Sequence, residues 1–204
     1  MTTTGQDSHL IEVKTDSREV LKGHFLHAFR DTVSLPDGSS AIREYVVHPG
    51  AVMVIPLLMD ANGQMRLVLE RQFRYPVGQV MIEFPAGKLD ARESIEQCAR
   101  RELQEETGYT AREWARAGTM HPVIAYSTEF IDIWFARGLS PGERKLDQGE
   151  FLDVFTATPE EFLQWCAQGK VTDAKTLTGA LWLQNVLSGA WSLKWHAGAA
   201  SHQA

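Results

Sequence analysis

Short runs that mix apolar and charged residues fill the first 48 positions of the chain. Two of these runs, 18–29 and 41–48, flank the turn residues Leu35-Pro36-Asp37-Gly38. Pro, Asp and Gly favour tight turns, whereas Val, Phe and Tyr favour strands. The pattern predicts antiparallel strands joined by hairpins, and therefore a small N-terminal β unit over residues 1–48.

Longer apolar runs begin after Pro49. Residues 51–58 and 65–70 are rich in Val, Ile, Leu and Met, and the turn Asp60-Ala61-Asn62-Gly63 separates them. This arrangement predicts two strands, the first of them in the centre of a sheet. Further strands are predicted at 80–84, 131–136 and 151–155. Residues 49–204 are expected to form the second and larger domain.

Capping residues predict the end of one helix and both ends of another. Residues 94–107 have a helical pattern, and Gly108 is suited to end that helix. A second helix begins at Thr158-Pro159-Glu160-Glu161, where Thr is the N-cap, Pro occupies the first turn and the last Glu closes a capping box. Gly169 is expected to end it.

A third helix is predicted over residues 175–187, because apolar residues recur there at helical spacing. Its apolar side is made of Leu177, Leu181 and Val186 or Leu187. The tail 197–204 is expected to be frayed.

Composition indicates a globular protein. Of 204 residues, 44% are hydrophobic and 23% are charged, which argues against disorder. The net charge of −6 argues against nucleic acid as a partner. The apolar run 51–59 contains Pro56 and is too short to cross a membrane. Residues 1–8 are polar and lack the pattern of an export signal, so we expect no membrane partner and a cytoplasmic location.

Two glutamates of the helix 94–107 interrupt its apolar side. On a helical wheel Ile95, Cys98, Ala99 and Leu103 form the inward stripe, and Arg100, Arg101 and Gln104 lie opposite. Glu102 and Glu106 fall inside the stripe, one turn apart, with Glu105 beside them. Two inward carboxylates repel each other and lose hydration, and a divalent cation relieves both costs.

Carboxylate oxygens suit Mg²⁺ or Mn²⁺, which often bind substrate phosphates as well. The alternative interpretation is a solvated helix face on which the glutamates pair with Arg100 and Arg101. The inward placement favours the cation, and with it phosphoryl chemistry.

The segment 87–109 resembles the Nudix box, G-x5-E-x7-R-E-U-x-E-E-x-G-U, in which U is a bulky apolar residue. The matching residues are Gly87, Glu93, Arg101, Glu102, Leu103, Glu105, Glu106, Gly108 and Tyr109. The resemblance implies an α/β fold, the Nudix α/β/α sandwich with a mixed sheet, and cleavage of a nucleoside diphosphate linked to another group. By position it also implies that the Ala86 carbonyl, Glu102 and Glu106 bind Mg²⁺, for which Mn²⁺ can substitute. Glu105 is implied as a further ligand, directly or through water, and so as part of the catalytic set.

Outside the box the chain is similar to the ADP-ribose pyrophosphatase subgroup of that family. The supporting segments are 71–76, 83–87, 126–129 and 150–154. The subgroup implies a homodimer in which the N-terminal β unit reaches across to the partner. Pro122 stands closer to the box than the proline that often marks the subgroup, so other nucleoside diphosphate sugars remain alternatives to ADP-ribose.

Hydrolysis needs a group that activates water, and carboxylates committed to cations are poor candidates. Glu150 lies on a loop between Gly149 and a predicted strand, and it resembles the loop glutamate that acts as general base in the subgroup. Asp147 and Glu143 are nearby alternatives.

Several residues outside the box are candidates for substrate binding. Arg74 could place its guanidinium on a diphosphate, or be an ordinary surface arginine. Tyr126 and Phe73 could stack on the base, or belong to the core. Glu129 could bond a ribose hydroxyl, or be a plain loop carboxylate. Glu83, from the segment 83–87, completes this set in the main domain.

Arg43 and Glu44 lie in the segment expected to swap between subunits. Arg43 could complete the partner's site, although a dimer salt bridge or simple exposure would explain both residues equally well.

Two functions of different classes follow. The first is a Mg²⁺-dependent hydrolase that splits ADP-ribose or a related small-molecule nucleoside diphosphate sugar into a nucleoside monophosphate and a sugar phosphate. The second is a Nudix-fold sensor that binds such a nucleotide without cleaving it. The complete set Glu102, Glu105 and Glu106 favours the enzyme. A hydrolase of nucleoside triphosphates or capped RNA is a third possibility, disfavoured by the flanking segments and the acidic charge.

Overall fold

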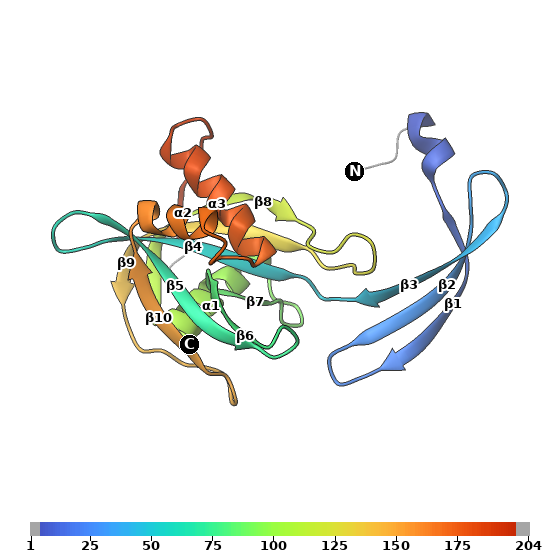
Figure 1. Ribbon diagram of the computed structural model, residues 1–204, viewed down its shortest axis with the longest axis horizontal. Helices are drawn as coiled ribbons and strands as arrows, with labels where there is room; N and C mark the ends of the chain where they lie inside the picture. Colours follow the sequence, from blue (N-terminus) through green and yellow to red (C-terminus); the bar gives the residue numbers. More distant parts are fainter. Residues whose placement is uncertain (1–4, 199–204) are drawn as a thin grey trace. The chain divides into compact units, whose positions relative to one another are not determined.

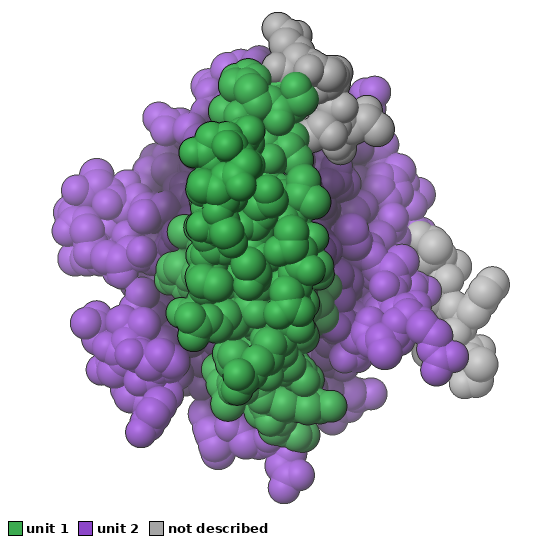
Figure 2. Space-filling view, turned by 90° about the vertical axis from the view of Figure 1, so that its right-hand side faces the viewer, with its two compact units in different colours: residues 1–49, 123–129 green, residues 50–122, 130–204 purple. Residues whose placement is uncertain are grey.

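The computed structural model describes residues 5–198, which form two compact units. Unit 1 comprises the residues up to Pro49 together with the loop Val123–Glu129. Unit 2 comprises Gly50–Pro122 and the residues from Phe130 onward. Figure 2 colours the two units separately. Unit 1 therefore combines the N-terminal segment with a loop from much later in the sequence.

Unit 1 is a three-stranded antiparallel sheet in the order β1-β2-β3 (Figure 1). After a 3₁₀ helix, η1 (Gly5–Leu10), its strands are β1 (Val13–Lys22), β2 (His27–Ser34) and β3 (Ser40–Val47). The predicted antiparallel strands joined by hairpins are confirmed. The run 18–29 contains one of the hairpins, because the chain reverses at residues 23–26, where the Gly23 N–H donates to the Leu26 carbonyl at 2.8 Å.

The loop 123–129 adds to β3 within unit 1. The Val46 N–H donates to the Tyr126 carbonyl at 2.9 Å, and the Thr128 N–H donates to the Val46 carbonyl at 3.0 Å. These two bonds extend the small sheet with residues that the sequence pattern did not place there.

Unit 2 is built on a mixed sheet in the order β10-β5-β4-β9-β8-β11, with β6 paired to β5 and β7 paired to β4. Strand β4 runs parallel to β9 and antiparallel to β5. The strands are β4 (Ala51–Met59), β5 (Met65–Arg74), β6 (Gln79–Glu83), β7 (Ala86–Lys88), β8 (Tyr109–Met120), β9 (Ile131–Pro141), β10 (Leu152–Ala157) and β11 (His196–Ala197). The helices are α1 (Ile95–Thr107), α2 (Pro159–Ala167) and α3 (Ala174–Leu187).

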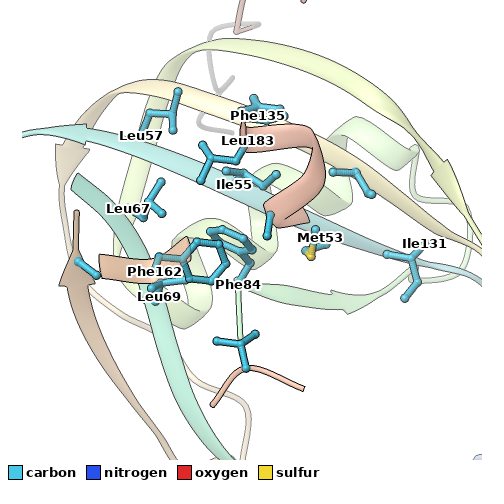
Figure 3. Close-up of a cluster of buried hydrophobic side chains, with 14 of the residues drawn as sticks. Met53, Ile55, Leu57, Leu67, Leu69, Phe84, Ile131, Phe135, Phe162 and Leu183 are labelled. Atoms are coloured by element: carbon cyan, nitrogen blue, oxygen red, sulfur yellow. The ribbon is translucent and has the colours of Figure 1, made fainter. Parts of the chain in front are cut away.

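The alternating side chains of β4 separate two apolar cores. Met53 and Ile55 pack with residues of α2 and α3, in the cluster that Figure 3 shows. Val52 and Val54 pack on the opposite face with α1. Because successive side chains of a strand point to opposite faces, helices cover both sides of the sheet. This is the predicted α/β/α sandwich with a mixed sheet, and β4 is its buried central strand.

The end predicted for α1 and the beginning predicted for α2 are confirmed. Ser94 caps α1 with a complete capping box, and Gly108 ends it with a φ of 77°. Thr158 and Glu161 form the expected capping box of α2.

The apolar side predicted for α3 is wrong except at Val186, which packs against the core. Leu177, Leu181 and Leu187 are exposed, whereas Thr176, Gly179, Ala180 and Leu183 are buried. A Cβ on Gly179 would lie 2.8 Å from the Met53 side chain, so small residues let this helix approach the sheet closely. Of the tail expected to be frayed, Ala197 lies in β11 and residues 199–204 lie outside the described part of the chain.

Strand β8 was not predicted. Its alternating charged residues do not resemble a core strand, but they pair with β9: Glu113 binds Arg137, and Arg116 binds the buried Asp132 at 2.8 Å. Cross-strand charge pairs of this kind stabilise the pairing of two strands even where apolar residues do not alternate regularly along them. Within residues 5–198 no helix is long and apolar enough to cross a bilayer.

Candidate active site

Helix α1 presents two carboxylates to the interior of unit 2. Glu102 is 8% exposed and Glu106 is 3% exposed, and Cys98, Ala99 and Leu103 are buried beside them. The predicted inward placement is therefore confirmed. Glu105 lies at the margin, with its side chain 32% exposed.

The loop between β6 and β7 fits closely against these glutamates. The Ala86 N–H donates to Glu106 Oε2 at 2.9 Å. A Cβ on Gly87 would lie 2.0 Å from the Glu102 carboxyl group, so only glycine leaves room for that carboxylate. Helix and loop thus hold two carboxylates beside the backbone of Ala86.

Burial and neighbouring charges disfavour the ionised form of the two inward glutamates. Burial raises the pKa of Glu102 to about 7, and the charges of Glu105 and Glu150 act in the same direction although Arg101 opposes them. Burial also raises the pKa of Glu106, together with the charges of Glu70, Glu102 and Glu150. Carboxylates held in this way gain strongly from a nearby cation.

Arg101 supplies positive charge from within the chain. The wheel placed it opposite the apolar stripe, yet its guanidinium turns back to the site. It donates to Glu102 at 2.7 Å, to Glu105 at 2.9 Å and to Glu93 at 2.9 Å. Among the side chains of residues 5–198, no three of the types His, Cys, Asp and Glu already surround one point as metal ligands.

Glu150 is brought to the same region by a turn before β10. Its N–H donates to the Asp147 carbonyl at 3.1 Å, and Gly149 has a φ of 88° that favours glycine. The Gln72 side-chain amide donates to Glu150 Oε1 at 3.2 Å. Glu150 thus lies near enough for its charge to act on both inward glutamates of α1.

Arg74 and Glu83 are paired with each other. The guanidinium Nε and Nη2 contact the two carboxylate oxygens at 2.7 and 2.9 Å. Lys175 donates to the same carboxylate and to Asp173, the N-cap of α3. Burial opposes ionisation of Glu83, but Arg74 and Lys175 outweigh it and lower its pKa.

Sequence reasoning missed Glu70 and Lys175. Glu70, on β5, is 0% exposed, and neither of its carboxylate oxygens has a hydrogen-bond partner. The signal for it was a charged residue at the end of the apolar run 65–70. The signal for Lys175 was its place two residues after Asp173, a good N-cap residue.

The remaining candidates lie elsewhere. Arg43, Tyr126 and Glu129 belong to unit 1: Arg43 Nε donates to Glu12 at 2.9 Å, Tyr126 is 60% exposed, and Glu129 lies 3.8 Å from His48. Phe73 is exposed on β5 and is not part of the core.

The donor set fits a hard divalent cation. All candidate ligands are oxygens, the carboxylates of Glu102 and Glu106 lie beside the backbone of residues 86–87, and the carboxylate of Glu70 is buried without a partner. Oxygen-only sites of this kind suit Mg²⁺ or Mn²⁺ better than softer metals.

Comparison with known proteins shows the family of the chain. The model of the NUDIX domain matches residues 47–178, which is more than half of the chain. The chain belongs to the Nudix family. The predicted family and enzyme class, a Nudix hydrolase, are thereby confirmed. The model of the nucleoside diphosphate sugar hydrolase N-terminal domain matches residues 12–46.

Curated relatives cover most of this Nudix chain. An ADP-ribose pyrophosphatase of Bacillus subtilis is 35% identical over 177 residues, covering 85% of this chain and 94% of the relative. A methanol dehydrogenase activator of Bacillus methanolicus is 36% identical over 180 residues, with coverages of 86% and 94%. An ADP-ribose pyrophosphatase of Mycobacterium tuberculosis is 31% identical, with coverages of 87% and 86%.

A solved structure described as that of an ADP compounds hydrolase superposes with a TM-score of 0.77. The two sequences are 20% identical, and the superposition covers 88% of this chain and 95% of the other chain. At this identity the likeness shows the fold, and it confirms the predicted Nudix architecture.

Proposed function

We propose that this Nudix hydrolase cleaves ADP-ribose, or a related nucleoside diphosphate sugar, with Mg²⁺ as its cofactor. Water adds to one phosphorus, the P–O bond of the anhydride bridge breaks, and the products are a nucleoside monophosphate and a sugar phosphate. The names of the Bacillus subtilis and Mycobacterium tuberculosis relatives support this substrate class.

The observation that carries the proposal is the pair of buried carboxylates beside the Ala86 loop. Glu102 and Glu106 would hold Mg²⁺ with the Ala86 carbonyl, and Glu105 would contribute at the margin. A bound divalent cation neutralises charge on the diphosphate. Arg101, which holds Glu102 and Glu105 in the described arrangement, keeps these carboxylates oriented.

Glu150 is the proposed general base. It lies apart from α1 and is bound by the Gln72 amide, so it can accept a proton from the attacking water while the helix carboxylates hold the cation. Asp147 and Glu143 are exposed on the same loop and remain the alternatives.

Arg74 and Glu83 are the proposed substrate contacts of unit 2. Two nitrogens of the guanidinium face Glu83, which leaves the Nη1 edge to bind a phosphate oxygen. Because Glu83 is ionised and bound by two cationic side chains, it fixes the direction of that edge.

Arg43, Tyr126 and Glu129 are the proposed contacts of unit 1. We propose a homodimer in which this unit serves the partner's site, with Tyr126 stacking on the base. The exposed tyrosine ring and the match to a nucleoside diphosphate sugar hydrolase N-terminal domain support this role.

A substrate panel tests the proposal. ADP-ribose, GDP-mannose, ADP-glucose, NADH and diadenosine polyphosphates are incubated with the protein in Mg²⁺ and in EDTA, and kcat/KM values are ranked. We expect ADP-ribose or another nucleoside diphosphate sugar to rank first, and EDTA to abolish the reaction. Binding of ADP-ribose without cleavage of any compound would instead favour the sensor.

A further inference from the structure

The carboxylate of Glu70 lies inside unit 2 on the α1 side of the sheet. Its neighbours along β5, Leu67 and Leu69, pack in the core formed with α2 and α3. Since side chains alternate along a strand, Glu70 faces the opposite way, toward α1. Its register partner on β6 is Glu83, three residues before Ala86, and the Ala86 N–H donates to Glu106 on α1. The charge of Glu70 also raises the pKa of Glu106.

The next two side chains on that face of β5 both form hydrogen bonds within the protein. Gln72 binds Glu150, and Arg74 binds Glu83. Glu70 differs from both, because it is 0% exposed and neither of its oxygens accepts a hydrogen bond. Arg74 and Lys175 direct their donors to Glu83 instead.

A carboxylate buried in this way is costly unless something compensates it. An unpaired buried charge loses its hydration, and a buried acceptor without a donor costs about 1–3 kcal/mol or more. Most buried polar groups in native proteins are satisfied, so each exception requires an explanation. Glu106 has one oxygen on the Ala86 N–H, and its other oxygen is left for a ligand.

We propose that Glu70 is a further carboxylate of the cation site and holds a divalent cation together with Glu106, directly or through a water molecule. This inference rests on the proposed function in that it assigns a divalent cation to the α1 carboxylates. It adds a ligand from β5, which lies outside the box, and so makes the cation a link between helix and sheet.

Binding of Mn²⁺ alone, measured by isothermal titration calorimetry at one pH, tests this site without any substrate. The parent protein is compared with Glu70→Gln, which keeps the size of the side chain and removes its charge. Glu113→Gln is the matched control, because Glu113 is a strand carboxylate of the same sheet that pairs with Arg137. Circular dichroism checks folding, and Glu70→Leu replaces Glu70→Gln if the amide does not fold.

We expect Mn²⁺ binding to weaken about 10- to 100-fold in the Glu70 variant and to stay unchanged in the control. Binding no weaker than that of the parent would overturn the inference and leave Glu70 as a protonated acid of the interior. If Mn²⁺ binding weakens in the Glu70 variant but the parent protein cleaves no nucleotide, the result would contradict the proposed hydrolase and leave the Glu70 cation site standing.

Discussion

Four buried glutamates of unit 2 differ in their partners, and this difference separates their roles. Glu83 is bound by Arg74 and Lys175 and stays ionised. Glu102 and Glu106 have raised pKa values, and Glu70 has no hydrogen-bond partner. A carboxylate that protein cations keep ionised can position a ligand, whereas one whose pKa is raised by burial, or that has no donor, gains from binding a cation.

Glu150→Gln is predicted to lower kcat by about 10²–10⁴. The amide has nearly the same size as the carboxylate and still forms hydrogen bonds, but it cannot accept the proton of water. We expect little change in KM or in the Mg²⁺ concentration for half-maximal rate, since the interaction lost belongs to the transition state. Steady-state kinetics with the best substrate measure both.

Asp147→Asn and Glu129→Gln are the comparison variants for this test. If kcat of Glu150→Gln stays within a few-fold of the parent, and one of the comparison variants loses its turnover instead, the base has been assigned to the wrong carboxylate.

At the scale of elements, α1 and the Ala86 loop form one assembly. The capping box at Ser94 fixes where the helix begins, and this sets which turn carries Glu102 and Glu106. Gly87 then leaves space for the Glu102 carboxyl group. The position of α1 against the Ala86 loop is therefore fixed, although the helix buries two like charges on one face.

The cost of that burial predicts how the metal-free protein responds to pH. Glu102 titrates near 4.5 in an unfolded chain and at about 7 in the folded one, and the pKa of Glu106 is raised as well. The folded state thus binds protons that the unfolded chain has lost, and stability falls as pH rises through the folded pKa. In EDTA we expect Tm to fall as pH rises from about 4.5 to 7 and beyond.

Glu106→Gln should make this fall shallower, because one of the titrating groups is gone. Thermal melts of both proteins in EDTA across that range give the comparison. A parent Tm that rises over the same interval would show that the buried carboxylates are not protonated on folding.

The sequence predicted those elements whose signals are local. Helix α1 follows from its periodicity, the glycine that ends it and the box, and β4 follows from a continuous apolar run. Strand β8 was missed because its charges are satisfied by β9, far along the chain. Glu70 and Lys175 were missed for the same reason: their surroundings come from strands and helices that local patterns cannot bring together.

At the scale of the whole molecule, unit 1 exposes much apolar surface. Every residue of β1 is exposed, and Val20, Leu21, Phe25 and Ile42 are among the large apolar side chains left open to solvent. A small sheet of three strands that leaves much apolar surface open is marginal on its own. A second copy of the chain is the partner that we propose to cover them.

Light scattering coupled to gel filtration tests this assembly. We predict twice the chain mass of 22.8 kDa at micromolar concentration, and a shift toward the monomer in Leu21→Glu, where a charge replaces exposed apolar surface. A monomeric parent that retains full activity would exclude the homodimer and, with it, the proposed role of Arg43 in a partner's site.

The central claim is that the inward carboxylates of α1 hold the cation used for hydrolysis. The most direct measurement is the rate of ADP-ribose cleavage in Mg²⁺, with the products separated by ³¹P NMR, for the parent, Glu102→Gln, Glu106→Gln and the control Glu113→Gln. The account predicts AMP and a ribose phosphate from the parent and the control, and turnover reduced by orders of magnitude in folded Glu102→Gln and Glu106→Gln. Near-normal turnover in both of these variants would contradict it.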